Sequence, residues 1–189
     1  MIQGEREVGL SMYSLTSGMD DGDIWAQTTS VVGPDDYIGA VLARLEDACD
    51  EMIRRVYPRI LDGEIEPDPQ DGARATYGTL RDAEHGRIDW RQSAERLYRW
   101  IRAQSAPYPG AFTSCRSRRL TIWKAHPFPA AYCGRPGEVA RGPSGEALVI
   151  CGDERALVID EMQVDDGKPV SPREVLRPRT VLGNVGNLE

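Results

Sequence analysis

The sequence lacks the residues from which most metal and disulfide sites are built. Its four cysteines are widely spaced, no two of them form a Cys-x-x-Cys pair, and the only histidines are His85 and His126. Structural zinc normally takes four such ligands at short spacings, so we expect no metal site. We expect the cysteines to be free, mostly buried thiols, as is usual in a reducing compartment.

Long apolar runs are also missing. The first ten residues, "MIQGEREVGL", contain no hydrophobic stretch typical of a secretory signal. No segment approaches the run of about 20 apolar residues that a membrane-spanning helix requires. We therefore expect a soluble, cytoplasmic protein with no membrane partner.

The charge of the chain is unevenly distributed. The net charge is −7 over 189 residues, but residues 1–90 hold 8 basic and 19 acidic side chains, whereas residues 91–189 hold 15 and 11. The first part should repel nucleic acid, and the second is only mildly basic. This difference predicts two parts with different surfaces, in a chain long enough for roughly one to one and a half domains.

Residues 1–62 predict two strands and a long helix. The segments 8–15 and 24–32 are short, apolar and rich in residues that favour strands. Apolar residues then recur at helical spacing from Ile38 to Ile60. Pro34 suits a first helical position, and Asp35 and Asp36 suit the first helical turn. Pro58 is expected to bend or end the helix near Tyr57, with Gly63 closing it.

The remainder predicts a linker, one helix and a set of short strands. Residues 62–88 are polar and interrupted by glycine and proline, and 92–104 has an amphipathic helical pattern. The predicted strands that follow are "LTIWKAH", "EVAR", "ALVICG", "ALVIDEMQ" and "KPVS". Strands at such intervals favour a small antiparallel barrel or sandwich.

One short stretch, "SGMDDGDI" (17–24), crowds three carboxylates and two glycines into eight positions. Alone it fits a solvated surface turn, and its spacing does not match a calcium loop. Other segments follow it in a fixed order: "PQDGARATY", "GRIDW", "IRAQSAPYPGAFT", "LTIWKA", "RPGEV", "ALVICGDERALVIDEMQ" and "GKPVS". Together they resemble the folate-dependent formyltransferases, the family that includes methionyl-tRNA and amino-sugar N-formyltransferases.

The resemblance implies an α/β fold. A partial formyltransferase (Rossmann-like) catalytic domain at 1–80 would be followed by a linker at 81–92 and by a small β-barrel (OB-like) C-terminal domain at 93–189. It also implies transfer of a formyl group from 10-formyltetrahydrofolate to a primary amine, without a metal. The co-substrate is therefore 10-formyltetrahydrofolate.

The resemblance also implies the site residues. The catalytic aspartate of the family falls on Asp20, with Asp21 and Asp23 expected to serve the turn through hydrogen bonds to the backbone. The pterin-binding loop of the family falls on Thr16, Ser17, Gly18 and Met19. The alternative for Asp20 is an inert turn carboxylate, and for the four loop residues an ordinary connection.

The family's upstream Asn-x-His motif does not occur in this sequence. The chain therefore resembles the C-terminal portion of a formyltransferase: a fragment, a misassigned start or a separately encoded half. We expect it to be inactive alone, because that asparagine and histidine stabilise the oxyanion in the family. A natural partner would be an upstream polypeptide that carries them.

The sequence is compatible with more than one class of acceptor amine. The segment "LYRWIRAQSAPYPGAFT" resembles amino-sugar formyltransferases, and this resemblance implies a nucleotide-linked amino sugar or another small amine as the acceptor. Methionyl-tRNA is the alternative, against which the mild charge of 91–189 counts. An inactive remnant or a partner-binding module is the non-enzymatic reading.

Several other residues have simpler interpretations. Arg116, Arg118 and Arg119 form either a solvated face or an anion-binding patch. His85 receives no role. The tryptophans at 90, 100 and 123 are expected in the core.

Overall fold

The computed structural model describes residues 1–183 and consists of two compact units. The N-terminal unit is Glu5–Leu80, and the C-terminal unit is Met1–Gly4 together with the chain from Arg81 onward. The elements of the N-terminal unit are β1 (Glu7–Tyr13), β2 (Ile24–Val31), α1 (Ile38–Leu61) and the 3-10 helix η1 (Gly72–Arg74). The domain limits expected from the sequence remain a prediction.

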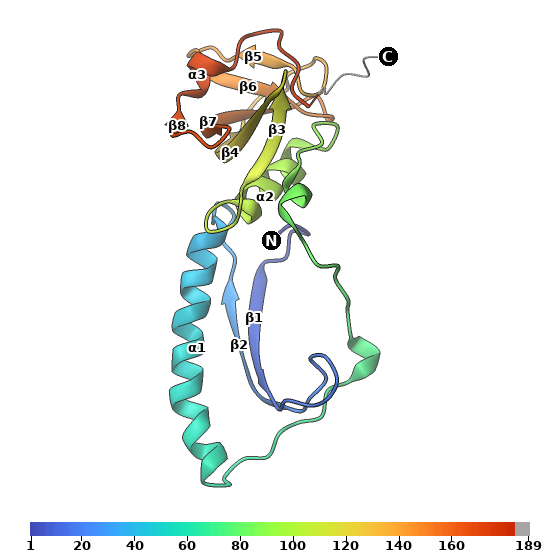
Figure 1. The fold of residues 1–189 in the computed structure, drawn as a ribbon, viewed down its shortest axis with the longest axis vertical. Helices are drawn as coiled ribbons and strands as arrows, with labels where there is room; N and C mark the ends of the chain where they lie inside the picture. The colour runs from blue at the N-terminus through green and yellow to red at the C-terminus, as the bar shows by residue number, and fades with distance from the viewer. Residues whose placement is uncertain (184–189) are drawn as a thin grey trace. The chain divides into compact units, whose positions relative to one another are not determined.

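In the N-terminal unit, β1 and β2 form an antiparallel pair with Glu7 opposite Val31. Val8, Leu10 and Met12 of β1 are half-buried, whereas the residues between them are exposed. The long helix α1 lies along β2 (Figure 1). One face of the strand pair is therefore covered and the other carries exposed side chains.

Helix α1 begins later than its sequence pattern indicates. It starts at Ile38 rather than at Pro34, which lies in the preceding turn. That turn is held by Asp36, whose carboxylate accepts a 2.7 Å hydrogen bond from the Gly33 amide and pairs with Arg44. The acidic side chain is thus used to close the turn, not to occupy the first helical turn.

The same helix continues through Pro58. It runs through Pro58 to Leu61, so the expectation of an end near Tyr57 is wrong. A proline lacks one amide donor, but its carbonyl still accepts, and the Asp62 amide donates to it at 2.9 Å. Gly63, with φ of +66°, then ends the helix as the sequence predicts.

The C-terminal unit is a curled antiparallel sheet with one covering helix (Figure 1). Its elements are the 3-10 helix η2 (Ala83–Gly86), α2 (Ala94–Gln104), β3 (Ala111–Cys115), β4 (Arg118–Pro127), β5 (Val139–Arg141), β6 (Ala147–Ile150), β7 (Ala156–Val164), β8 (Pro169–Val170) and α3 (Pro172–Val175). The strand order is β3-β4-β7-β6-β5, and β8 pairs with β7. The prediction of short antiparallel strands is confirmed, although β3 was not among the expected ones.

Helix α2 is fixed at its N-terminus by two acceptors. The Ser93 hydroxyl accepts from the Arg96 amide at 3.3 Å, and Asp153 accepts from the Ala94 amide at 3.1 Å. The core beneath α2 includes Ile88 and Trp90, which are 4% and 3% exposed. Part of the stretch expected as linker therefore belongs to this core.

The two edges of the curled sheet are joined by the segment 179–183. On β5, the Val139 amide donates to the Thr180 carbonyl at 2.8 Å. On β3, the Ser114 carbonyl accepts from the Gly183 amide at 2.8 Å. The sheet thus closes on itself through a segment that forms no regular strand.

All four cysteines are free, as expected, but they are not mostly buried. Only Cys151 is fully buried, and burial raises the pKa of its thiol to about 12. Cys133 is exposed, and Cys49 and Cys115 are half-buried. Within residues 1–183, every helix is too short or too polar to cross a bilayer.

Candidate functional site

The candidate site is the loop between β1 and β2, residues 14–23. The Ser14 amide donates to the Asp23 carbonyl at 2.9 Å, which closes the base of the loop. Just beyond it, Ile24 and Asp68 exchange two backbone hydrogen bonds of 2.7 and 2.8 Å. The loop is therefore anchored both to its own strand pair and to the chain that follows α1.

Asp20 lies in this loop with a left-handed backbone, at φ of +56°. This conformation is uncommon for a residue other than glycine, although aspartate tolerates it better than most. The Tyr13 hydroxyl donates a 2.5 Å hydrogen bond to Oδ1 of Asp20. The carboxylate raises the pKa of Tyr13, chiefly through that hydrogen bond and secondly through its charge. Asp20 is exposed, so its second oxygen is accessible to a ligand.

A residue distant in sequence holds the loop backbone. The Gln70 side-chain amide donates to the carbonyl oxygens of Asp20 and Gly22, at 2.9 and 2.6 Å. Gln70 belongs to "PQDGARATY", one of the segments that carry the resemblance. The two segments therefore meet, and one fixes the backbone that presents the carboxylate of the other.

Gly22 is the buried point of the loop. A Cβ atom added there would lie 1.8 Å from the Ser14 carbonyl oxygen, which is backbone and cannot rotate away. Only glycine permits this close approach, on which the turn after Asp20 depends.

Four further predicted residues lie consecutively on the exposed part of the loop: Thr16, Ser17, Gly18 and Met19. The Thr16 hydroxyl accepts from the Gly18 amide at 3.2 Å. Met19 is 90% exposed, an unusual position for a large apolar side chain. These residues and Asp20 thus form one continuous, outward-facing loop.

Asp21 and Asp23 contribute to the shape of the loop in different ways. The carboxylate of Asp21 accepts from the Thr16 hydroxyl, a side chain rather than the expected backbone group. Asp23 acts through its backbone carbonyl, which accepts from the Ser14 amide. Asp21 therefore has a side-chain role in the turn, although with a different partner from the one expected, whereas the described hydrogen bond of Asp23 is made by its backbone.

Sequence reasoning missed two residues of the site, Tyr13 and Gln70. Tyr13 was interpreted only as a strand residue, and a seven-residue separation gives no pattern from which its contact with Asp20 could be inferred. Gln70 was noted as part of a motif without a role. Its contact joins positions 50 residues apart, which only the fold brings together.

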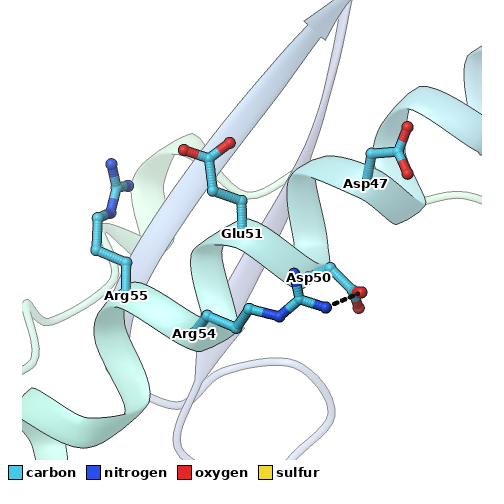
Figure 2. A pocket seen from close by; sticks show the side chains of 5 residues that line it. All are labelled: Asp47, Asp50, Glu51, Arg54 and Arg55. Carbon is cyan, nitrogen blue, oxygen red and sulfur yellow. Dashed lines mark hydrogen bonds and ion pairs between the residues drawn. The ribbon is translucent and has the colours of Figure 1, made fainter.

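Helix α1 has a shallow depression on its surface (Figure 2). It is lined by Asp47, Asp50, Glu51, Arg54 and Arg55. Arg54 and Asp50 form a 3.1 Å ion pair one turn apart, with side chains 79% and 67% exposed. Such a pair contributes at most a few tenths of a kcal/mol, on the order of 0.3–0.5, and marks a solvated helix face.

His85 lies in the 3-10 helix η2 and has a structural partner. The His85 ring lies 2.8 Å from the Asp82 carboxylate in a capping box of η2, a structural role. Hydrogen bonds from His85 hold the pKa of Asp82 below its usual value. Across residues 1–183, no three His, Cys, Asp or Glu side chains are grouped so that they could hold a metal ion.

Comparison with known proteins shows the family to which the chain belongs. Residues 81–179, more than half of the chain, match the model of the formyl transferase C-terminal domain. The chain is also 32% identical over 177 residues to a methionyl-tRNA formyltransferase of Halalkalibacterium halodurans. The match covers 94% of this chain and 56% of that protein, so the chain spans little more than half the length of this relative. The chain belongs to the formyltransferase family.

Solved structures agree on the fold. HypX from Aquifex aeolicus, solved in complex with tetrahydrofolic acid, superimposes with a TM-score of 0.69 over 92% of this chain and 30% of that one, at 21% identity. An N-formyltransferase from Helicobacter canadensis, in complex with folinic acid and dTDP-3-aminofucose, gives a TM-score of 0.61 at 15% identity over 84% and 57%. The mixed α/β structure is therefore shared with these proteins, and its curled antiparallel sheet corresponds to the formyl transferase C-terminal domain. A Rossmann-like identity for the N-terminal unit remains a prediction.

Proposed function

We propose that this chain supplies the aspartate and the pterin loop of a 10-formyltetrahydrofolate-dependent N-formyltransferase. The observation that carries the proposal is the presentation of Asp20 by an anchored loop, between Tyr13 on one side and the Gln70 contacts on the other. Membership in the family supports the reaction class. The tetrahydrofolic acid in the related HypX structure supports a folate as the donor.

In the proposed step, the lone pair of a primary amine attacks the formyl carbon of the donor. The bond between that carbon and N10 of the folate then breaks, and the formyl group remains on the amine. Asp20 accepts the proton that the amine loses, as a general base within hydrogen-bond reach would, and a proton is returned to N10. Residues 16–19 contact the pterin ring, mainly through backbone groups.

The reaction also needs donors for the oxyanion that develops on the formyl oxygen. The polar donors beside Asp20 are engaged in shaping the loop: Tyr13 binds Asp20, Thr16 binds Asp21, and Gln70 binds backbone carbonyls. We therefore propose that the asparagine and histidine of the family come from a further segment or polypeptide, and that the 189 residues alone do not transfer formyl groups.

For the acceptor, we propose a small primary amine, such as that of a nucleotide-linked amino sugar. The dTDP-3-aminofucose bound by the Helicobacter canadensis enzyme supports this class. Methionyl-tRNA is the second candidate, favoured by the name of the 32% identical relative. An inactive or partner-binding role is the remaining alternative.

The test is a chimera. The portion of the Halalkalibacterium halodurans protein that this chain does not match is fused upstream of the 189 residues, and formyl transfer is assayed with amino-sugar nucleotides and with methionyl-tRNA. We expect turnover by the chimera and none by the chain alone. Turnover only with methionyl-tRNA would select the second acceptor. A folded but inactive chimera would contradict the enzymatic proposal.

A further inference from the structure

The C-terminal unit contains a hollow of about 290 Å³ beside the β3–β4 hairpin. Four arginines line it: Arg87, Arg116, Arg118 and Arg119. They come from two chain segments, one next to η2 and one at the hairpin, and they converge on a single hollow. A chain with net charge −7 has no general excess of cations, so this concentration is a local feature.

Two of these guanidinium groups are held by an aromatic ring. The Cζ atoms of Arg119 and Arg87 lie 3.4 and 4.8 Å from the centre of the Phe112 ring, which is itself 3% exposed. Glu84 pairs with both, at 2.8 Å to Arg87 and 3.4 Å to Arg119. Stacking and pairing fix the planes of these two groups before any ligand arrives.

The other two arginines provide the available charge. Arg118 pairs through Nε with Asp165 at 2.9 Å, which leaves its terminal nitrogens as further donors, and Arg118 holds the pKa of Asp165 below its usual value. Arg116 occupies the hairpin turn with φ of +56° and forms no ion pair with any of residues 1–183. Four guanidinium groups against two carboxylates leave the hollow with an excess of two positive charges.

A buried hydroxyl at the same place lacks a partner. Ser114 lines the hollow, and its Oγ atom is buried without a hydrogen bond to any of residues 1–183. Buried hydroxyls normally have a partner, so one is expected from water or a ligand. A small hollow lined by guanidinium groups and a hydroxyl suits a tetrahedral oxyanion, to which arginine donates in pairs.

We propose that this hollow binds a compact phosphate-bearing anion, a phosphate or diphosphate group, with Arg116 and Arg118 as its main ligands. The convergence of the arginines on one hollow, rather than along a surface track, distinguishes it from a groove for a nucleic-acid backbone, which needs charges spaced over several phosphates. The hollow belongs to the C-terminal unit and the Asp20 loop to the N-terminal unit, and this proposal does not depend on the proposed formyl transfer.

The test titrates inorganic pyrophosphate into the full chain and follows backbone amide signals by NMR. We expect saturable shifts at residues 114–119. Arg116→Asn removes the charge with a side chain that suits a left-handed backbone, and should weaken binding at least about tenfold. Arg118→Lys keeps the charge but loses the planar fork, and should give a smaller loss. Arg155→Gln, an exposed arginine outside the hollow, is the matched control and should change the affinity less than about twofold.

Each other outcome overturns the proposal. Shifts that do not saturate, or an equal loss in Arg155→Gln, would show only general attraction to charge. If a short RNA duplex binds and pyrophosphate does not, the hollow is part of a nucleic-acid-binding surface and not a site for a compact anion. The amide spectra of the variants show whether each variant is folded. If Arg116→Asn does not fold, the loss of affinity in Arg118→Lys still tests the proposal.

Discussion

The hydroxyl of Tyr13 donates to the carboxylate of Asp20 at 2.5 Å, across the loop that joins β1 to β2. Tyr13 is the last residue of β1, so this hydrogen bond ties the candidate catalytic group to the end of a strand. The contact can be measured without any assay of activity, because the Asp20 carboxylate raises the pKa of the Tyr13 phenol.

The first prediction concerns this titration. Since the carboxylate raises the pKa of Tyr13, the contact stabilises the fold fully below the phenol's ordinary pKa of about 10, and that contribution is lost as the pH rises through the higher folded-state value. Asp20→Asn should return the pKa of Tyr13 towards its ordinary value. Ultraviolet titration of the phenolate, with Tyr13→Phe subtracted to isolate one of the seven tyrosines, gives the answer. An unchanged titration in Asp20→Asn would mean that the contact does not exist in solution.

The second prediction concerns catalysis in the chimera. Asp20→Asn keeps the size of the side chain but removes its basicity, so single-turnover formyl transfer should slow by roughly 10²–10⁴-fold. Asp21→Asn retains an oxygen that can accept from the Thr16 hydroxyl and should change the rate little. A larger loss of rate for Asp21→Asn than for Asp20→Asn would show that Asp20 is not the catalytic base and that the loop is a solvated turn.

The third prediction compares two glycines of the same loop. Gly22→Ala places a methyl group 1.8 Å from a backbone oxygen, so the loop must move. Gly18→Ala meets the Asp21 carboxylate at 2.0 Å, but that side chain can rotate away. Gly22→Ala should therefore cost more stability in thermal unfolding and should also lower the pKa of Tyr13, by displacing Asp20. Equal effects of the two changes would refute this account of the turn.

The fourth prediction tests how the curled sheet closes. Leu182, 3% exposed, belongs to the core although it lies outside every regular element. Leu182→Ala should destabilise the C-terminal unit by about 2–5 kcal/mol, as core leucine truncations do. Leu80→Ala, at a position 94% exposed, should change stability by less than about 0.5 kcal/mol. Denaturant unfolding of both variants decides whether the closing segment contributes to the core.

The fifth prediction concerns the division of the chain. Residues 68–85 are exposed throughout and include Arg74 and Arg81. Limited trypsin treatment should cut there first and release a stable fragment that contains α2 and the curled sheet. First cleavage after Arg155, in the turn between β6 and β7, would contradict a division at this point.

Much of the fold follows from the sequence because local patterns carry it. The strands at 8–15 and 24–32, the helix at 92–104 and most strands of the sheet were identified within a few residues, since side-chain periodicity and turn residues act locally. The start of α1 was misplaced because Asp36 closes the turn before the helix, and Pro58 does not end the helix because its carbonyl still accepts a hydrogen bond from Asp62. Strand β3 was missed because its five residues follow a turn and have no alternation.

The candidate site was predictable only in part. Motif resemblance proposed Asp20 and the loop at 16–19 as candidates, but Tyr13 and Gln70, which hold the loop, act across the fold. The arginine hollow was recognised as a choice between a solvated face and an anion site. The proposal of an anion site also uses Phe112 and Glu84, which no sequence pattern connects to the hairpin.

The closing segment 179–183 also bears on how the protein folds. Until it docks, the edges of β3 and β5 present unpaired backbone groups, which are templates for pairing with another chain. Its partner on β3 lies more than sixty positions earlier in the chain, and contacts of such sequence separation form late and slowly. A nascent or transiently opened molecule is therefore most prone to aggregate in the interval before this segment is in place.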